Sequence, residues 1–200
     1  MPFPSPPWQL EASAWLSLFA VRESGRADRP GGLYAAAFVD YGEGSVLTYH
    51  ELLVARVVRS GPAPQLRITD IWVDSPVSRN GGRSLWAIPK ELADLPLRSG
   101  AYGPVVRTTV SGVAQGQHLA SATFVSVPGA ALVRLPFMTA TSQPDLDGGD
   151  RLVVTRVAGS SRVAPARASW RFDERGPLAF LAGRRAVASF HLRDASLSFG

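Results

Sequence analysis

The chain alternates between short runs of apolar, β-branched and aromatic residues and short breaks rich in Gly, Pro, Asp and Ser. Runs of this kind are typical of β-strands, and the residues in the breaks supply turn geometry. Many short strands with little helix predict a mostly β (α+β) domain with a closed or strongly curved antiparallel sheet. The clearest predicted strands are residues 33–40, 66–73, 105–114, 118–127, 131–140, 151–159, 167–173 and 186–199.

Three segments in the first third of the chain have a less regular pattern. Residues 1–7 are rich in proline and predict an extended arm, with Trp8 as its anchor. Residues 15–21 fit either a strand or a short helix. Residues 45–59 are ambiguous too, but their β-branched content favours a strand over most of that length.

The stretch between the predicted strands 66–73 and 105–114 contains the only helix that the pattern favours. Residues 74–82 are interpreted as a loop because they contain Pro76 and Gly81-Gly82. Residues 89–94 are predicted to form one or two turns of helix, since Pro89 suits a first helical position.

Length and composition describe an ordinary globular chain. The 200 residues, of which 18% are charged, fit a single domain that spans residues 1–200. No apolar run approaches the roughly 18 residues that cross a bilayer, and residues 1–15 do not resemble a secretory signal, so no membrane partner is expected and the cytoplasm is the default location. There is no cysteine, which excludes disulfides, thiolate metal sites and cysteine nucleophiles.

The net charge of +5 could suit an anionic partner. The basic residues do not form a continuous run, however. The densest groups, Arg162 to Arg175 and Arg184-Arg185, fall in segments interpreted as strands. Solvated arginines in an arginine-rich composition are therefore the favoured interpretation, and no nucleic-acid partner is expected.

Several common kinds of site are missing from the pattern. His50, His118 and His191 are isolated, so no metal site is expected. Residues 145–150 contain three aspartates but lack the later glutamate of a calcium loop, and a plain acidic turn is favoured. No glycine-rich phosphate loop or nucleophile-elbow serine is present.

Lys90 is the only lysine, and the remaining basic residues are arginines. A lysine amine can condense with a ketone or aldehyde, whereas a guanidinium stays protonated and cannot. A chance surface lysine is the simpler explanation from composition alone. The apolar neighbours Leu85 to Pro89 and Leu92-Ala93 favour a buried amine with a lowered pKa, and the positive end of a short helix would lower it further.

Three short motifs carry a resemblance to a known family. They are Tyr49-His50-Glu51, then Gly82-Arg83, and then Ile88-Pro89-Lys90, with Lys90 placed 39 positions after Glu51. Together they resemble the acetoacetate decarboxylase superfamily, and residues 186–199 resemble its closing strand. The resemblance implies a cone-shaped β-barrel in a homo-oligomer, with a Schiff-base lysine in an apolar interior pocket and no cofactor.

The resemblance also implies roles for particular residues. Lys90 takes the place of the Schiff-base lysine and Glu51 that of the active-site glutamate. Arg83 matches the motif arginine and would pair with Glu51 or with an acidic substrate, or else hold the loop through a structural ion pair. Glu51 would otherwise simply lie on the solvated face of its strand. The apolar residues Ile71, Trp72 and Trp86 are assigned to the substrate-binding set, although core packing is the favoured interpretation of both tryptophans.

The chain departs from the family pattern at three places. Glu91 stands where the decarboxylases have a second lysine, and Ala36 stands where they have a further acidic residue. An arginine near the N-terminal strand of the family is also missing, since residues 11–14 contain none. Acetoacetate decarboxylase is a standard example of a lysine activated by desolvation or by a cationic neighbour. A carboxylate that faced Lys90 would instead stabilise its ammonium form, unless Glu91 faces away or water screens it.

The leading hypothesis is a Schiff-base-forming lyase that acts through Lys90 on a β-keto acid or related keto compound. The same lysine could serve an aldolase, dehydratase or cyclase. The alternative from another class is a non-catalytic β-barrel that binds an apolar ketone or carboxylic ligand, with Lys90 paired to Glu91. A structural or regulatory module is the third possibility.

Overall fold

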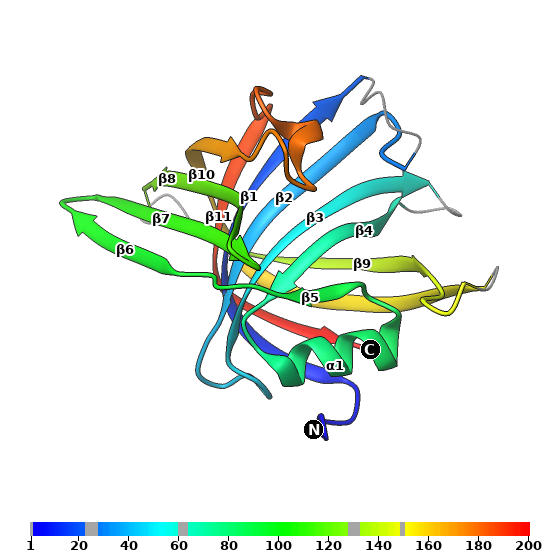
Figure 1. The fold of residues 1–200 in the computed structure, drawn as a ribbon. Helices are drawn as coiled ribbons and strands as arrows, with labels where there is room; N and C mark the ends of the chain where they lie inside the picture. The colour runs from blue at the N-terminus through cyan, green and yellow to red at the C-terminus, as the bar shows by residue number, and fades with distance from the viewer. Residues whose placement is uncertain (1, 23–27, 60–63, 128–132, 149–150) are drawn as a thin grey trace.

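The computed structural model describes residues 2–22, 28–59, 64–127, 133–148 and 151–200. Strands dominate these residues, as the alternating pattern predicted, and they form a large curved sheet (Figure 1). The strands are β1 (Trp8–Val21), β2 (Gly32–Tyr41), β3 (Tyr49–Arg59), β4 (Pro64–Val73), β5 (Lys90–Leu92), β6 (Leu97–Tyr102), β7 (Val105–Ala114), β8 (Gln117–Ser126), β9 (Arg134–Pro144), β10 (Leu152–Phe172) and β11 (Ala188–Phe199).

Part of the sheet closes on itself. The strand order β11-β1-β2-β3-β4-β9-β10 returns to its start because β10 also pairs with β11. Neighbours in this ring are antiparallel except at β4 and β9, which meet through the single parallel pair Leu66–Thr141. The ring agrees with the predicted closed or strongly curved sheet, and its interior is where the candidate site lies.

The rest of the sheet forms an arm that projects from the ring (Figure 1). Strand β10 leaves β11 after Pro165 and continues by pairing with β8 from Ala166 onward. A proline suits such a junction because it has no N–H to contribute to a ladder. The sequence predicted two separate strands at residues 151–159 and 167–173, and this was wrong, since β10 is continuous over 21 residues. Strand β6 at the arm's edge was not predicted.

The helix lies elsewhere than predicted. Helix α1 spans Pro76–Trp86 and includes most of residues 74–82, which were interpreted as a loop. Residues 90–92 form β5 beside β4 rather than a helix. Ser75 caps α1 by accepting a hydrogen bond from the Ser78 N–H at 3.2 Å, with Pro76 at the start of the helix. Ala87 ends it in the left-handed conformation at φ 52°. The cap residues Ser75 and Pro76 could be recognised in the sequence, but Gly81-Gly82 favoured a loop over a helix.

Apolar side chains are buried in two clusters, one on each face of the curved sheet, because successive strand residues point to opposite faces. One cluster fills the space between the ring and the arm and includes Phe19, Phe38 and Phe124. The other lies inside the ring and includes Trp8, Ile71 and Trp86. Helix α1 lies beside this second cluster, close to both chain termini (Figure 1).

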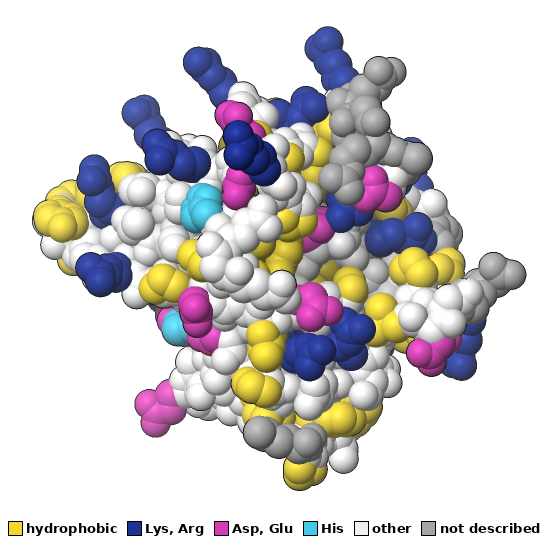
Figure 2. Space-filling model, viewed as in Figure 1, with side chains coloured by type: hydrophobic (Ala, Val, Ile, Leu, Met, Phe, Trp, Pro, Cys, Tyr) yellow, Lys and Arg dark blue, Asp and Glu magenta, His cyan; other side chains and the backbone are white. Residues whose placement is uncertain are grey.

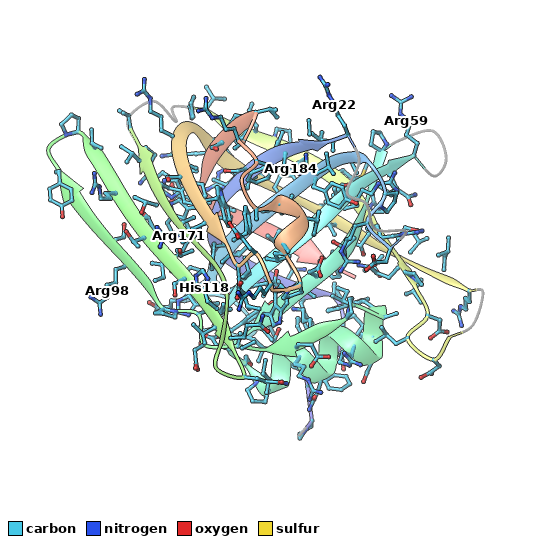
Figure 3. The ribbon with its side chains drawn as sticks, turned by 45° about the horizontal axis from the view of Figure 1, so that its top comes forward. Arg22, Arg59, Arg98, His118, Arg171 and Arg184 are labelled. Atoms are coloured by element: carbon cyan, nitrogen blue, oxygen red, sulfur yellow. The ribbon has the colours of Figure 1, made fainter. Side chains whose placement is uncertain are left out.

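Basic side chains are spread over the surface. Figure 2 shows them along the upper edge of the molecule, with acidic side chains among them. Arg22 after β1, Arg59 at the end of β3 and Arg98 on β6 point outward from separate places (Figure 3). Arg184-Arg185 follow a 3-10 turn rather than lying in a strand, which corrects the sequence interpretation. No helix among the described residues is long and apolar enough to span a membrane.

Candidate active site

The interior of the ring contains a cavity of about 160 Å³. Strands β1 to β4, β5 and β9 to β11 all contribute to its walls, together with the end of α1. Most of the lining is apolar, and among the described residues that line it only Lys90 and Glu51 have a formal charge. The lining consists of Trp8, Leu10, Tyr41, Tyr49, Glu51, Leu53, Ala55, Leu66, Ile68, Ile71, Trp86, Ile88, Lys90, Thr139, Thr141, Val157, Leu197 and Phe199.

Lys90 is buried in this cavity, with 4% of its surface exposed. Its Nζ lies 2.9 Å from Glu51 Oε2, and it donates to Ser78 Oγ at 3.0 Å and to Tyr49 Oη at 3.3 Å. The ammonium group also lies 5.0 Å from the centroid of the Tyr49 ring. An ammonium has three N–H donors, so these three partners account for all of them.

The sheet register explains why two residues 39 positions apart meet. Strand β5 lies parallel to β4, with Lys90 beside Ile71, and β3 lies antiparallel to β4 on the other side, with Glu51 beside Val73. Tyr49 and Glu51 share a face of β3, because alternate strand residues point the same way. Glu51 is 3% exposed and accepts a further hydrogen bond from Tyr41 at 3.3 Å. It is therefore inward and not on the solvated face.

The two glycines of α1 let the helix approach the cavity closely. A Cβ on Gly82 would lie 2.8 Å from Lys90 Cδ, and a Cβ on Gly81 would lie 2.6 Å from the Trp8 ring. Contacts this short are essentially never made by a real Cβ, so a larger residue would displace its neighbour. The Gly81-Gly82 pair, interpreted from sequence as a turn, instead gives the lysine side chain room to lie against the helix.

Charge inside the cavity raises the pKa of Lys90. Burial favours the neutral amine and is the largest single effect, but Glu51 and Tyr49 favour the ammonium and together raise the pKa above its ordinary 10.5. The apolar neighbours of Lys90 in the sequence predicted a lowered pKa, and this prediction was wrong because the Glu51 carboxylate lies 2.9 Å from the amine. Burial and the negative charge of Glu51 likewise raise the pKa of Tyr41 well above 10.

Glu91 lies on the other side of β5 from Lys90. It accepts a hydrogen bond from Arg83 Nη1 at 2.8 Å, and Arg79 lies 3.8 Å from its second oxygen. Strand alternation separates the two neighbours, since residue 90 points into the ring and residue 91 points out. Glu91 is therefore not the partner of Lys90, and Arg83 pairs with Glu91 rather than with Glu51.

The chain matches the family model described as Acetoacetate decarboxylase (ADC) over residues 27–194. This chain belongs to the acetoacetate decarboxylase family. A search of curated proteins found no match.

Solved structures of this fold resemble the chain closely in shape and weakly in sequence. The enduracididine biosynthesis enzyme MppR, complexed with pyruvate, has 15% identity and a TM-score of 0.69, with 98% of this chain and 88% of that chain covered. An acetoacetate decarboxylase-like enzyme from Sphingomonas wittichii RW1 has 15% identity and a TM-score of 0.65, with 98% and 91% covered. Acetoacetate decarboxylase from Legionella pneumophila has 13% identity and a TM-score of 0.65, with 98% and 86% covered. At these identities the likeness shows a shared acetoacetate decarboxylase fold.

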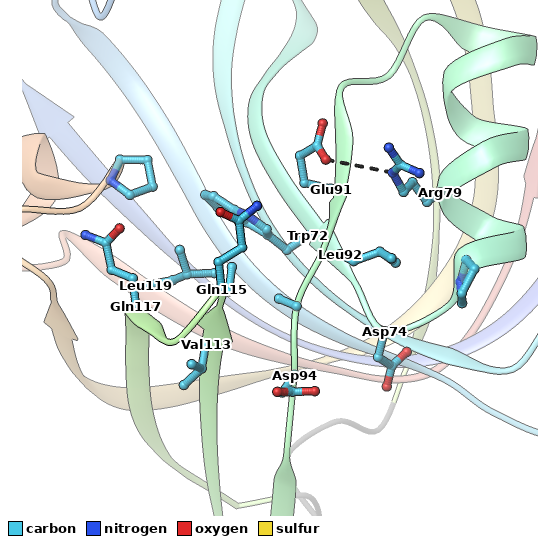
Figure 4. A pocket seen from close by; sticks show the side chains of 14 residues that line it. Trp72, Asp74, Arg79, Glu91, Leu92, Asp94, Val113, Gln115, Gln117 and Leu119 are labelled. Atoms are coloured by element: carbon cyan, nitrogen blue, oxygen red, sulfur yellow. Dashed lines mark ion pairs between the residues drawn. The ribbon is translucent and has the colours of Figure 1, made fainter.

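The remaining residues assigned from sequence line three different cavities. Ile71 and Trp86 line the cavity around Lys90. Trp72 follows Ile71 on β4 and therefore points the opposite way, into a larger hollow of about 800 Å³ outside the ring (Figure 4). Glu91 and Arg79 also line this hollow, whereas Arg83 lines a third one beside residues 145–147. Trp72 and Arg83 thus do not line the cavity around Lys90, although Arg83 donates a hydrogen bond to the Lys90 backbone carbonyl at 3.2 Å.

Two residues that contact the buried pair of Lys90 and Glu51 were not predicted from the sequence. Ser78 accepts a hydrogen bond from Lys90, and Tyr41 donates one to Glu51. Ser78 could be found only once α1 was recognised, because the helix brings it to the lysine. Tyr41 lies opposite Tyr49 in the β2–β3 register, so hairpin pairing from the Gly42–Gly44 turn was the available signal. No group of three metal-binding side chains is present in the described ranges.

Proposed function

We propose that this chain is an enzyme that forms a Schiff base between Lys90 and a keto compound. The observation that carries the proposal is the placement of the sole lysine in an apolar cavity, 2.9 Å from a buried carboxylate. The pair offers a nucleophile and an acid/base next to it, which is the arrangement that amine catalysis requires. Tyr41, Tyr49 and Ser78 orient the two groups.

The reaction begins with a proton transfer inside the pair. The Lys90 ammonium passes a proton to Glu51, whose carboxylate lies 2.9 Å away, and the amine is then free and the pair uncharged. The free amine then adds to the carbonyl carbon, and the carbonyl oxygen leaves as water with two protons, one from the amine nitrogen and one from Glu51. The product is an iminium on Lys90.

The iminium then acts as the electron sink. Carbon dioxide or a proton leaves the adjacent carbon, and its electron pair forms the C=C bond of an enamine. Glu51 is the acid that protonates the enamine, or the base that takes the proton. Water finally hydrolyses the iminium, releases the product and restores the Lys90 amine. These steps require no metal or organic cofactor.

Reductive trapping tests the proposal. The native protein is incubated with keto acids and ketones in the presence of sodium borohydride, and the intact chain is weighed. Because Lys90 is the only lysine, an adduct can form there or at the N-terminal amine. We expect one adduct per chain in the native protein and none in Lys90→Arg. Peptide mapping of the native protein should find no adduct on the N-terminal amine. If no carbonyl compound traps at Lys90 in the folded protein, the Schiff-base function is wrong.

A second candidate function is a barrel that binds an apolar keto or carboxylic ligand without turnover. One observation favours it, namely that all three N–H groups of the Lys90 ammonium already have partners. Lys90 would then stabilise Glu51 rather than react. The same experiment separates the two functions, because a binding barrel would retain a ligand in native mass spectra without forming a reducible adduct.

A further inference from the structure

We infer that the substrate of this cavity is an uncharged ketone whose second polar group is also neutral, and not a keto acid. This inference rests on the proposed function, because it assumes that the carbonyl reacts with Lys90. It concerns the rest of the substrate molecule, for which the charges and hydroxyls of the cavity wall are informative.

Among the described residues that line the cavity, no cation is left to bind a substrate carboxylate. Among the described lining residues, Lys90 and Glu51 alone carry formal charge, and they neutralise each other. Arg83, the other cation in the sequence motifs, pairs with Glu91 and lines a different hollow. A substrate carboxylate would therefore enter the cavity without a cation to bind it.

Formation of the iminium does not remove this difficulty. The iminium on Lys90 carries one positive charge, which the Glu51 carboxylate 2.9 Å away already balances. A keto acid would add a second carboxylate and leave one negative charge unpaired among Leu, Ile and Trp side chains. An unpaired buried charge is among the most unfavourable arrangements in a protein. An uncharged ketone keeps the cavity neutral at every step.

A hydroxyl in the wall indicates where a second, neutral polar group would bind. Thr141 on β9 lines the cavity and is 3% exposed, and its Oγ1 has no hydrogen-bond partner among the described residues. A buried polar atom without a partner is uncommon and asks for an explanation. A hydroxyl or carbonyl oxygen of the substrate would satisfy it. Thr139 on the same strand also lines the cavity, and hydroxyls of this kind suit a neutral oxygen because they carry no charge to balance a carboxylate.

The size of the cavity limits the substrate to a small molecule. A dry cavity of about 150 Å³ accommodates a benzene-sized ligand, and this one is of similar volume at about 160 Å³. A ketone of roughly six to eight heavy atoms fits such a space. The apolar walls would bind its alkyl groups.

The test compares ketones that differ in charge but hardly in shape. Levulinate and 5-methyl-2-hexanone have nearly the same outline, with a carboxylate in one where the other has an isopropyl group. The rate of borohydride trapping at Lys90 is measured for each by intact mass and is normalised to trapping on a lysine-containing peptide. We expect the uncharged ketone to trap at least about tenfold faster after normalisation.

Two variants sharpen the comparison. Glu51→Gln removes the charge that balances the iminium, so levulinate should gain on 5-methyl-2-hexanone in that variant. Thr141→Val removes the hydroxyl without changing the shape of the side chain. It should abolish the preference of the native protein for 4-hydroxy-4-methyl-2-pentanone over 4,4-dimethyl-2-pentanone, a pair that exchanges a hydroxyl for a methyl group. Circular dichroism checks that each variant is folded, and the two native comparisons do not depend on the variants.

Each outcome has a distinct meaning. If levulinate traps as fast as 5-methyl-2-hexanone or faster, the uncharged-substrate inference is overturned while the Schiff-base function stands. If Thr141→Val retains the preference for the hydroxy ketone, the assignment of Thr141 is overturned. If none of the four ketones traps at Lys90, the proposed function fails and the inference fails with it.

Discussion

At the residue scale, the chemistry of this protein depends on which carboxylate meets Lys90. Two glutamates were candidates from the sequence, Glu51 at 39 positions away and Glu91 directly adjacent. The structure places Glu51 at 2.9 Å and turns Glu91 outward to Arg83. Glu91 therefore places no unpaired negative charge beside Lys90.

Glu51→Gln is expected to lower the pKa of Lys90. In the native protein Glu51 favours the ammonium against burial, and in the variant burial acts with much less opposition, so the pKa should fall from above 10.5 to below it. Reductive methylation with ¹³C-formaldehyde labels the one lysine and the N-terminus, and an NMR titration then follows the lysine signal by itself.

Glu91→Gln is the matched control for this titration. This variant makes the same chemical change at the sequence neighbour of Lys90. In the native protein the Glu91 carboxylate is exposed and hydrogen-bonded to Arg83. The pKa of Lys90 should stay close to its native value in this variant. Equal shifts in the two variants would contradict the assignment of Glu51 as the partner, and no shift in either would mean that the pair is broken in solution.

The buried pair also shows what a sequence can predict about a site. The resemblance assigned Lys90 and Glu51, and both line the same cavity. Ser78 and Tyr41 were missed because their contacts depend on a helix and a hairpin register that the sequence pattern did not define. Trp72 was assigned with Ile71 to one site, although neighbours on a strand face opposite ways and line different hollows.

At the scale of elements, helix α1 is the part of the fold that the site depends on most. Its Ser75 cap and Pro76 start were readable in the sequence, but Gly81-Gly82 lowered its helix propensity and favoured a loop. Packing explains the glycines better than propensity does, since they face Trp8 and Lys90 at distances that exclude a Cβ. Packing against Trp8 and Lys90 thus explains why the segment is helical, although its local sequence preference favoured a loop.

Gly82→Ala is expected to slow trapping at Lys90 by at least about tenfold and to destabilise the fold by about 1 kcal/mol. Alanine would gain roughly 0.5–1 kcal/mol in helix propensity, but its Cβ would meet Lys90 Cδ at 2.8 Å, and overpacking of this kind costs about 1–3 kcal/mol. Urea unfolding and borohydride trapping measure the two effects.

Gly42→Ala is the control for that substitution. Gly42 lies in the turn before β3, and a Cβ there would have no heavy atom within 4 Å among the described residues. Trapping at Lys90 should therefore be unchanged. A Gly82→Ala protein that traps at the native rate would show that the lysine does not need the close approach of α1.

At the scale of the whole molecule, the fold depends on pairings between distant parts of the chain. The predicted strands were mostly correct in kind, but the alternating pattern does not specify that β11 returns to lie between β1 and β10. That closure creates the cavity, because β1 and β11 supply Trp8, Leu197 and Phe199 to its wall. The homo-oligomer implied by the family resemblance stays a prediction, as does the location in the cytoplasm.

His191 lies at this closure and is expected to make the fold sensitive to acid. It pairs in register with Trp15 of β1 and Ala164 of β10, and its ring stacks on Trp15 at 4.8 Å. Burial, with help from Arg193, lowers its pKa to about 4 from the usual 6.5. Ser126 Oγ lies 3.0 Å from its Nδ1.

The direction of the pH effect follows from which state takes up the proton. Between pH 6.5 and about 4 the unfolded chain protonates His191 and the folded chain does not, so the free energy of unfolding falls as the pH decreases through this range. The contribution is complete above pH 6.5, and its loss by pH 4 amounts to at most about 3 kcal/mol. Urea unfolding of the native protein and of His191→Gln, measured from pH 7.5 to 4, isolates this term from the carboxylates that titrate in both proteins.

We expect the two stability curves to converge as the pH falls, because the variant has no imidazole to protonate. Parallel curves for His191→Gln would show that the imidazole is protonated in the folded protein. The contact between β11 and β1 would then have to accommodate a charge beside Trp15, and the closure of the ring would not be the acid-sensitive part of the fold.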